Sequence, residues 1–240
     1  IEGPAGTGKT YLAKTLSKIF ETQLIRLQCH EGIDEDKALY EWNYKKQLIS
    51  IQTEKDSKNL FTEEFLIERP ILQALRTENK SIFLVDEIDR SDEEFEALLL
   101  EVLAENQVSI PELGTITSKN ENLTVLTSNA TRELSEALRR RCLYFYLDYP
   151  SVDIETKVIL NNVENIDEEK ARKFSIFSNF VRSLGLNKPP SLIESVEWVK
   201  YNHVKNEDSL DSNIGILIKD IEDQKVYLEK IKEDNANKNQ

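Results

Sequence analysis

The segment that most constrains this chain lies at its start, where residues 3–10 read Gly-Pro-Ala-Gly-Thr-Gly-Lys-Thr. It fits the pattern G-x-x-x-x-G-K-[ST], and three of the chain's seven glycines fall within it. Glycines let the backbone wrap so that several N–H groups point at one anion, and the amphipathic helix that follows adds its positive N-terminal end. The pattern predicts a phosphate-binding loop between a strand and a helix. The alternative is a glycine-rich turn that binds nothing.

The side chains of the loop indicate which groups of a nucleotide it holds. Lys9 is predicted to reach the β and γ phosphates of ATP, and the Thr10 hydroxyl is predicted to bind Mg²⁺. The predicted ATP-binding residues of the loop are Gly3, Pro4, Ala5, Gly6, Thr7, Gly8, Lys9 and Thr10.

Two adjacent carboxylates, Asp86 and Glu87, come at the end of an apolar strand predicted over Ser81–Asp86. Ligands of open parallel sheets bind at the carboxyl ends of the strands, so Asp86 is predicted to join the nucleotide site and to hold Mg²⁺ with Thr10. Glu87 is then free to polarise a water, which favours ATP hydrolysis over phosphoryl transfer to another substrate. The alternative is that both are solvated charges after a strand.

Two later features fit a hydrolase that works as an assembly. A short apolar run ends in Asn129, whose amide could orient the attacking water or contact the γ phosphate, although such a residue is often part of a turn. Three arginines, Arg139, Arg140 and Arg141, form the densest positive cluster of an acidic chain. A guanidinium suits the charge of a transferring phosphoryl group, but a solvated face is the alternative.

Apolar runs alternate with amphipathic stretches over residues 1–149, which predicts an α/β fold with a parallel sheet. No convincing strand follows Pro150, and an all-helical unit is expected over residues 150–205, with a helical or partly disordered tail over 206–240. A hairpin is predicted over Val108–Thr117. The predicted strands are Ile1-Glu2, Leu24–Cys29, Ser81–Asp86, Asn122–Asn129 and Leu143–Asp148, and helices are predicted over Thr10–Phe20, over Ser91–Glu105 with a capping box at Ser91 and Glu94, and after a capping box at Ser191 and Glu194.

Charge and composition exclude several classes of partner. The net charge is −13, so a nucleic-acid backbone would be repelled. Cys29 and Cys142 show neither zinc-ligand nor disulfide spacing, which fits a reduced cytoplasm. No apolar run approaches the length of a membrane span, and no signal peptide is recognisable, so a soluble protein is predicted. The absence of methionine, even at position 1, indicates a fragment.

With these motifs the chain resembles the AAA+ ATPases, which are P-loop NTPases, and among them the CoxD-like branch of the MoxR group. Gly3–Thr10 looks like Walker A, Leu84–Glu87 like Walker B, Asn129 like sensor 1 and Arg141 like the arginine finger. The segments that carry the closer resemblance are Ile25–Cys29, Ala38–Tyr44, Asp86–Arg90, Ile110–Ile116 and Arg139–Tyr144.

The resemblance implies a five-stranded parallel sheet with helices on both faces, a small helical lid from about Ser151, and a ring, usually a homo-hexamer, with ATP at the subunit interfaces. It also implies chaperone-like work on a client protein, commonly with a von Willebrand factor A domain partner. In the CoxD-like branch the client is a molybdenum hydroxylase, carbon monoxide dehydrogenase, whose metal centre is matured.

The chain departs from this group near Pro189, where the lid usually carries a sensor 2 arginine and the nearest cation here is Lys188. The aromatic residues Tyr40, Trp42 and Tyr44 could grip a substrate protein or belong to a local core. Two other functions stay open: a nucleic-acid motor or clamp-loader-like ATPase, and a nucleotide-gated binding module with negligible turnover.

Overall fold

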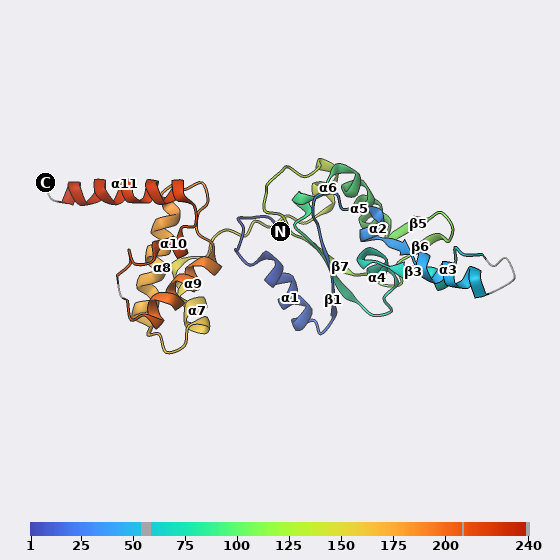
Figure 1. The fold of residues 1–240 in the computed structure, drawn as a ribbon, viewed down its shortest axis with the longest axis horizontal. Coiled ribbons are helices and arrows are strands. Elements are labelled where there is room, and N and C mark those ends of the chain that lie inside the picture. The colour runs from blue at the N-terminus through green and yellow to red at the C-terminus, as the bar shows by residue number, and fades with distance from the viewer. Residues whose placement is uncertain (54–58, 208, 239–240) are drawn as a thin grey trace. The chain divides into compact units, whose positions relative to one another are not determined.

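The computed structural model describes residues 1–53, 59–207 and 209–238. By internal contacts the chain divides into two compact units. The first comprises residues 1–3 and 8–147, and the second comprises residues 4–7 and 148–240. Figure 1 gives the order of their elements along the chain.

The first unit mixes helices and strands. Its helices are α1 (Lys9–Ile19), α2 (Glu35–Ala38), α3 (Tyr44–Thr53), α4 (Pro70–Arg76), α5 (Glu93–Glu105) and α6 (Glu136–Arg141), with the 3₁₀ turns η1 (Glu63–Phe65) and η2 (Ile88–Arg90). Its strands are β1 (Gln23–Gln28), β2 (Tyr40–Trp42), β3 (Leu66–Glu68), β4 (Ser81–Asp86), β5 (Gln107–Ile110), β6 (Gly114–Thr117) and β7 (Leu123–Leu126).

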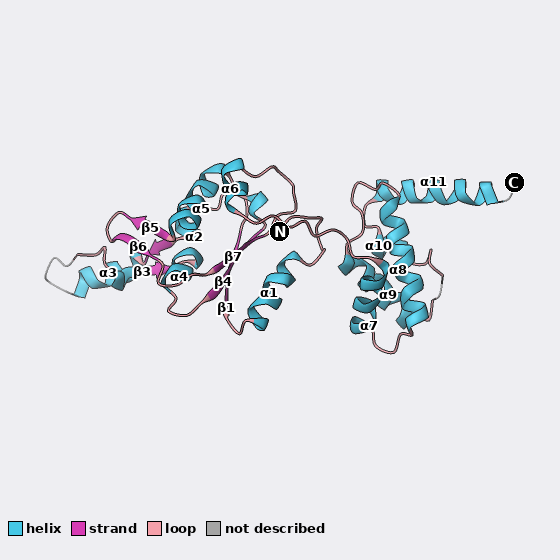
Figure 2. Ribbon diagram, turned by 180° about the vertical axis from the view of Figure 1, so that it is seen from behind, coloured by secondary structure: helices cyan, strands magenta, loops and turns pink. Residues whose placement is uncertain are grey.

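A parallel sheet in the order β1-β4-β7 forms the centre of this unit, and its strands lie side by side in Figure 2. Every residue of β4 is buried, as its apolar sequence requires. Glu2 extends the sheet through single parallel bridges to Ser128 on one side and Tyr146 on the other. Because all these segments run in one direction, the carboxyl ends of β1, β4 and β7 meet at one edge of the sheet.

Helices cover both faces of this sheet. Side chains alternate between the two faces along each strand, so neighbouring residues of one strand pack against different helices. Ile25 and Phe83 pack in one cluster with residues of α4 and α5. Leu24, Ile82 and Leu84 pack with α1 on the opposite face. The predicted α/β fold is confirmed.

Several predictions about individual elements can be compared with the structure. The hairpin is confirmed as β5 and β6, which pair antiparallel. Residues 143–148, predicted as a strand, form only the bridge at Tyr146, since the segment beside them in this chain is the two-residue stretch Ile1-Glu2. The capping box at Ser91 is wrong, because Asp92 caps α5 by accepting from the Phe95 N–H while the Ser91 hydroxyl donates to the Ile88 carbonyl.

The described residues of the second unit from 148 onward form helices and the loops between them. Its helices are α7 (Val152–Asn162), α8 (Glu168–Ser183), α9 (Leu192–Val204), α10 (Ile214–Leu217) and α11 (Ile221–Lys238). The capping box of Ser191 and Glu194 at the start of α9 is confirmed. The core contains Phe174, Phe177 and Trp198, with ring centroids 4.8 Å (Phe174–Trp198) and 5.4 Å (Phe177–Trp198) apart.

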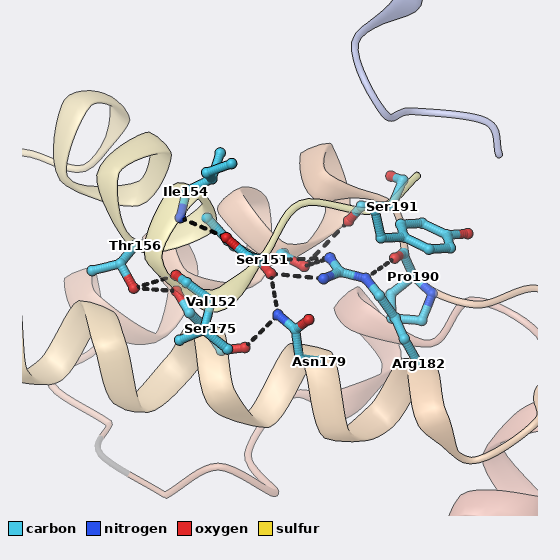
Figure 3. A network of polar contacts seen from close by, with 12 residues as sticks. Ser151, Val152, Ile154, Thr156, Ser175, Asn179, Arg182, Pro190 and Ser191 are labelled. Atoms are coloured by element: carbon cyan, nitrogen blue, oxygen red, sulfur yellow. Dashed lines mark hydrogen bonds and ion pairs between the residues drawn. The ribbon is translucent and has the colours of Figure 1, made fainter. Parts of the chain in front are cut away.

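A buried polar network joins α7, α8 and the start of α9 (Figure 3). The Arg182 guanidinium makes a two-pronged ion pair with Glu155, with N···O distances of 2.7 and 2.9 Å. Glu155 is completely buried, and Arg182 also donates to the Pro190 carbonyl and the Ser195 hydroxyl. The pair therefore has the hydrogen-bond partners that a buried charge requires.

In the part of the chain that the structure describes, every helix is too short or too polar to cross a bilayer.

Candidate active site

The backbone of residues 3–10 adopts conformations that depend on glycine at two positions in particular. Gly8 has φ +100° and sits directly before α1. At Gly3 a Cβ atom would lie 2.0 Å from the Leu147 carbonyl oxygen, so only hydrogen fits there. Gly3 therefore lies close against the backbone of Leu147, and the left-handed turn at Gly8 leads directly into α1.

The two polar side chains of that first turn are held in place. Lys9 is buried, and its Nζ donates to the Gly3 carbonyl oxygen at 2.8 Å. Burial lowers the pKa of Lys9, although the nearby Asp89, Asp86 and Glu87 oppose this shift. Thr10 Oγ1 lies 2.9 and 3.1 Å from the two carboxylate oxygens of Asp86. The structure thus brings together two predicted residues that are 76 positions apart in the sequence.

The Asp86 carboxylate is the centre of the site. It is only 2% exposed and accepts from Thr10, from Thr127 Oγ1 at 2.5 Å, and from the Arg26 guanidinium. Arg26 Nη2 and Nε lie 2.6 and 3.1 Å from Asp86 Oδ2. Neither Thr127 nor Arg26 was identified as a site residue by sequence reasoning. The only signal for Arg26 was a cation inside the short, otherwise uncharged strand β1.

Glu87 has an unusual backbone and a partly open side chain. Its φ of +57° is left-handed, which a residue with a Cβ atom adopts at a cost, and its N–H donates to Thr127 Oγ1 at 3.0 Å. The side chain is 30% exposed, and Oε2 lies 3.0 Å from Arg90 Nη1. The Glu87 carboxylate is therefore more accessible than that of Asp86 and is paired with Arg90.

The loop that follows β7 is tied to the turn after β4 by Asp89. This buried carboxylate accepts from the backbone N–H of Asn129 and Thr131 at 3.1 and 3.0 Å, and from the Thr131 hydroxyl at 2.6 Å. Burial alone would raise the pKa of Asp89, but these hydrogen bonds lower it below its usual value. The position of Asn129 is thus fixed relative to Glu87 through its backbone.

The three arginines of α6 differ in their partners. Arg139 pairs with Glu133, and Arg140 pairs with Glu136. Arg141 is exposed and donates to the Ala137 carbonyl at 3.2 Å, and among the described residues it pairs with no carboxylate. All three lie at the C-terminal end of α6. Arg141 is therefore the member of the cluster whose charge is least committed within its own chain.

The donor set fits a magnesium ion carried by a nucleotide. Thr10 and Asp86 offer hard oxygen atoms, as Mg²⁺ prefers, and the described residues contain no cluster of three or more metal-binding His, Cys, Asp or Glu side chains. A few protein oxygens, with phosphate and water completing the shell, is the arrangement expected for Mg²⁺ bound with a nucleotide.

Two other residues singled out in the sequence can now be placed. The Lys188 ammonium lies 2.9 Å from Asp220 Oδ2, and the hydrogen bond and charge of Asp220 raise the pKa of Lys188. Trp42 is buried against Tyr40 and Phe61, whereas Tyr44 is exposed. Trp42 therefore belongs to a local core.

Comparison with known proteins identifies the family. The model of the AAA domain, dynein-related subfamily, matches residues 1–142, which is more than half of the chain. The chain belongs to this AAA family. The chain is also similar to uncharacterized proteins of Staphylococcus aureus (strain NCTC 8325) and Staphylococcus saprophyticus. Each is 24% identical over 190 residues, which cover 77% of this chain and 68% of the relative.

A solved structure supports the AAA fold of this chain. NtrX from Brucella abortus, solved in complex with ADP, is 16% identical to this chain, with a TM-score of 0.50. The match covers 88% of this chain and 46% of the NtrX chain. A mutant of Thermotoga maritima RuvB is 19% identical, with a TM-score of 0.49. That match covers 91% of this chain and 59% of the RuvB chain. The chain therefore spans only about half the length of these two structures.

Proposed function

We propose that this AAA domain binds ATP with Mg²⁺ at residues 3–10 and hydrolyses it to ADP and phosphate. The observation that carries the proposal is the contact of Thr10 with both oxygens of Asp86, because it joins the glycine-rich loop to the carboxylate at the end of β4. The AAA family and the ADP held by NtrX support a nucleotide as the ligand.

The predicted site residues divide the proposed reaction among them. Lys9 and the loop N–H groups bind the phosphates, while Thr10 and Asp86 hold the metal side of the nucleotide. The Mg²⁺ ion supplies charge neutralisation on the phosphates when it is bound. Glu87, more exposed than Asp86 and adjacent to it, polarises the attacking water, and Asn129 positions that water.

The last role requires a second copy of the chain. Arg141, exposed at the end of α6, completes the site of a neighbouring subunit, where its charge stabilises the transferring phosphoryl group. This assignment depends on a ring, and a homo-hexamer is the form that the MoxR resemblance favours.

The biological task is proposed from resemblance to the MoxR group. We infer a cytoplasmic, chaperone-like ATPase that remodels or matures a client protein, with a von Willebrand factor A domain protein as a partner. The CoxD-like resemblance points to a molybdenum hydroxylase such as carbon monoxide dehydrogenase as the client.

Two substitutions test the reaction. Lys9→Ala should abolish nucleotide binding in calorimetry, since the buried ammonium that faces the loop is lost. Glu87→Gln should bind ATP with nearly unchanged affinity but lose roughly 10²- to 10⁴-fold in hydrolysis rate, because a positioned general base is removed. Lys14→Ala and Glu101→Gln, exposed positions on α1 and α5, are matched controls and should behave like the wild type.

The outcome distinguishes the remaining functions. Wild-type turnover in Glu87→Gln would show that the assigned base is wrong, and negligible turnover of the assembled wild-type protein would favour a nucleotide-gated binding module. DNA-stimulated hydrolysis would instead favour a nucleic-acid motor. Mass spectrometry of proteins that co-purify with ATP-bound Glu87→Gln, compared with Lys9→Ala, tests the client.

A further inference from the structure

The ion pair between Arg26 and Asp86 has no assigned role in the proposed reaction. The guanidinium and the hydroxyls of Thr10 and Thr127 together occupy both oxygens of a carboxylate that is almost completely buried. We infer that Arg26 is a positioning residue that serves as the counter-ion of Asp86 when no metal is bound and gives up Asp86 Oδ2 when Mg²⁺ binds with the nucleotide. This inference rests on the proposed ATP site.

The position of Arg26 in the sheet follows from strand register. Arg26 pairs with Leu84 and Gln28 pairs with Asp86, so the guanidinium reaches diagonally along the sheet to the end of β4. Leu24 and Leu84 pack with α1 on this face, and residues two apart in a strand share a face, so Arg26 lies on the side of α1. The first turn of α1 carries Lys9 and Thr10, which places the cation beside the proposed phosphate site.

The two partners of this ion pair differ in exposure and in their other hydrogen bonds. The Asp86 side chain is 2% exposed and is fixed by two hydroxyl donors, whereas the Arg26 side chain is 38% exposed. Two donors of Arg26, Nε and Nη2, converge on the single oxygen Oδ2. The arginine can therefore leave the pair by rotating its long side chain into solvent, while the carboxylate stays in place.

The charge of Arg26 is useful at this site without metal, but the guanidinium must leave Asp86 Oδ2 when Mg²⁺ binds. A buried carboxylate beside a phosphate site repels the phosphates unless a cation neutralises it. Arg26 does so without metal, but a guanidinium 2.6 Å from Oδ2 competes with Mg²⁺ for the same oxygen. The dependence of nucleotide affinity on Mg²⁺ is therefore damped by Arg26.

The test measures the dissociation constant of ADP by calorimetry in excess EDTA and in excess Mg²⁺. The dissociation constant in EDTA divided by that in Mg²⁺ should rise roughly 5- to 50-fold in Arg26→Gln. In this variant Asp86 repels metal-free ADP, and no cation competes with Mg²⁺ for its carboxylate. Arg26→Lys keeps the charge and should restore a ratio close to the wild type. Arg172→Gln, which removes a surface ion pair with Asp153, is the matched control and should leave the ratio unchanged.

Several results would overturn the inference. An unchanged or smaller ratio in Arg26→Gln would do so, and this includes an equal loss of affinity with and without Mg²⁺, which would make Arg26 a phosphate ligand. Thermal unfolding with Mg²⁺ and ADP shows whether each variant is folded. Failure of the wild type to bind ADP at all would overturn the proposed function itself, so the two failures are distinguishable.

Discussion

Asp89 fixes the loop that follows β7 through the hydrogen bonds of one buried carboxylate. Its two oxygens accept three hydrogen bonds from Asn129 and Thr131, and the side chain is buried. A neutral amide cannot replace it, because an NH₂ group would face an N–H donor. Asp89 thereby acts on the proposed water-positioning residue without needing to touch a substrate.

Asp89→Asn should lower the free energy of unfolding by about 1–3 kcal/mol, the cost of leaving a buried donor without an acceptor. The pKa of Asp89 is lowered in the folded state, so its contribution is complete above the usual value of 3.8 and is lost as the pH falls through the lowered pKa. Urea denaturation at neutral and acidic pH should show that the variant lacks this part of the acid sensitivity.

Asp36→Asn, at an exposed position of α2, is the control and should unfold like the wild type at both pH values. Equal stability of Asp89→Asn and the wild type at neutral pH would contradict the assigned hydrogen bonds.

The sequence predicts a contact between two residues when the chemistry of a motif requires both of them. The Thr10–Asp86 contact was predictable, because the chemistry of a phosphate loop demands an acidic partner at a strand end. Arg26 and Thr127 could not be predicted, since their contacts with Asp86 depend on the registers of β1 and β7 against β4. The Arg90 pair with Glu87 arises from the left-handed turn at Glu87, which no residue type in the sequence indicates.

A buried ion pair links Glu155 of α7 to Arg182 of α8, and Arg182 also donates to Ser195 of α9. Arg182→Met should destabilise the chain by about 3–5 kcal/mol, because it leaves the charge of Glu155 buried without a partner. The double variant Glu155→Leu, Arg182→Met removes both charges and should recover most of this loss in urea denaturation. If the double variant is no more stable than Arg182→Met, the loss comes from packing and the electrostatic explanation is wrong.

Predictions of elements succeeded where local sequence and tertiary packing agree. The strand over Ser81–Asp86 has the predicted bounds because its apolar run is buried on both faces of the sheet. The capping box at Ser191 is also local, and it is formed. At Ser91 the same pattern misleads, since the adjacent Asp92 caps α5 and the serine closes the preceding 3₁₀ turn. Residues 143–148 need a pairing partner from outside their own segment.

For the whole molecule, the decisive question is whether one chain completes a site by itself. Arg141→Ala should retain ATP binding but lose roughly 10³-fold in hydrolysis rate, because the proposed finger acts across subunits. An equimolar mixture of Arg141→Ala and Lys9→Ala should regain activity, since each Lys9→Ala subunit still offers its Arg141 to an intact neighbouring loop. ATPase assays of each variant and of the mixture check this.

Arg140→Ala, which loses only the pair with Glu136, is the control for the cluster. Full activity of Arg141→Ala, or a mixture as inactive as its components, would contradict a site shared between subunits.

Cys29 can serve as a chemical reporter of local opening at the sheet edge. Its backbone N–H donates to the Asp86 carbonyl at 2.9 Å, its side chain is completely buried, and burial raises the pKa of its thiol to about 12. A thiol in this state has almost no thiolate at neutral pH, so a thiol reagent can label it only after the structure around Cys29 opens. Each labelled Cys29 therefore records one local opening, at a residue whose backbone is hydrogen-bonded to that of Asp86.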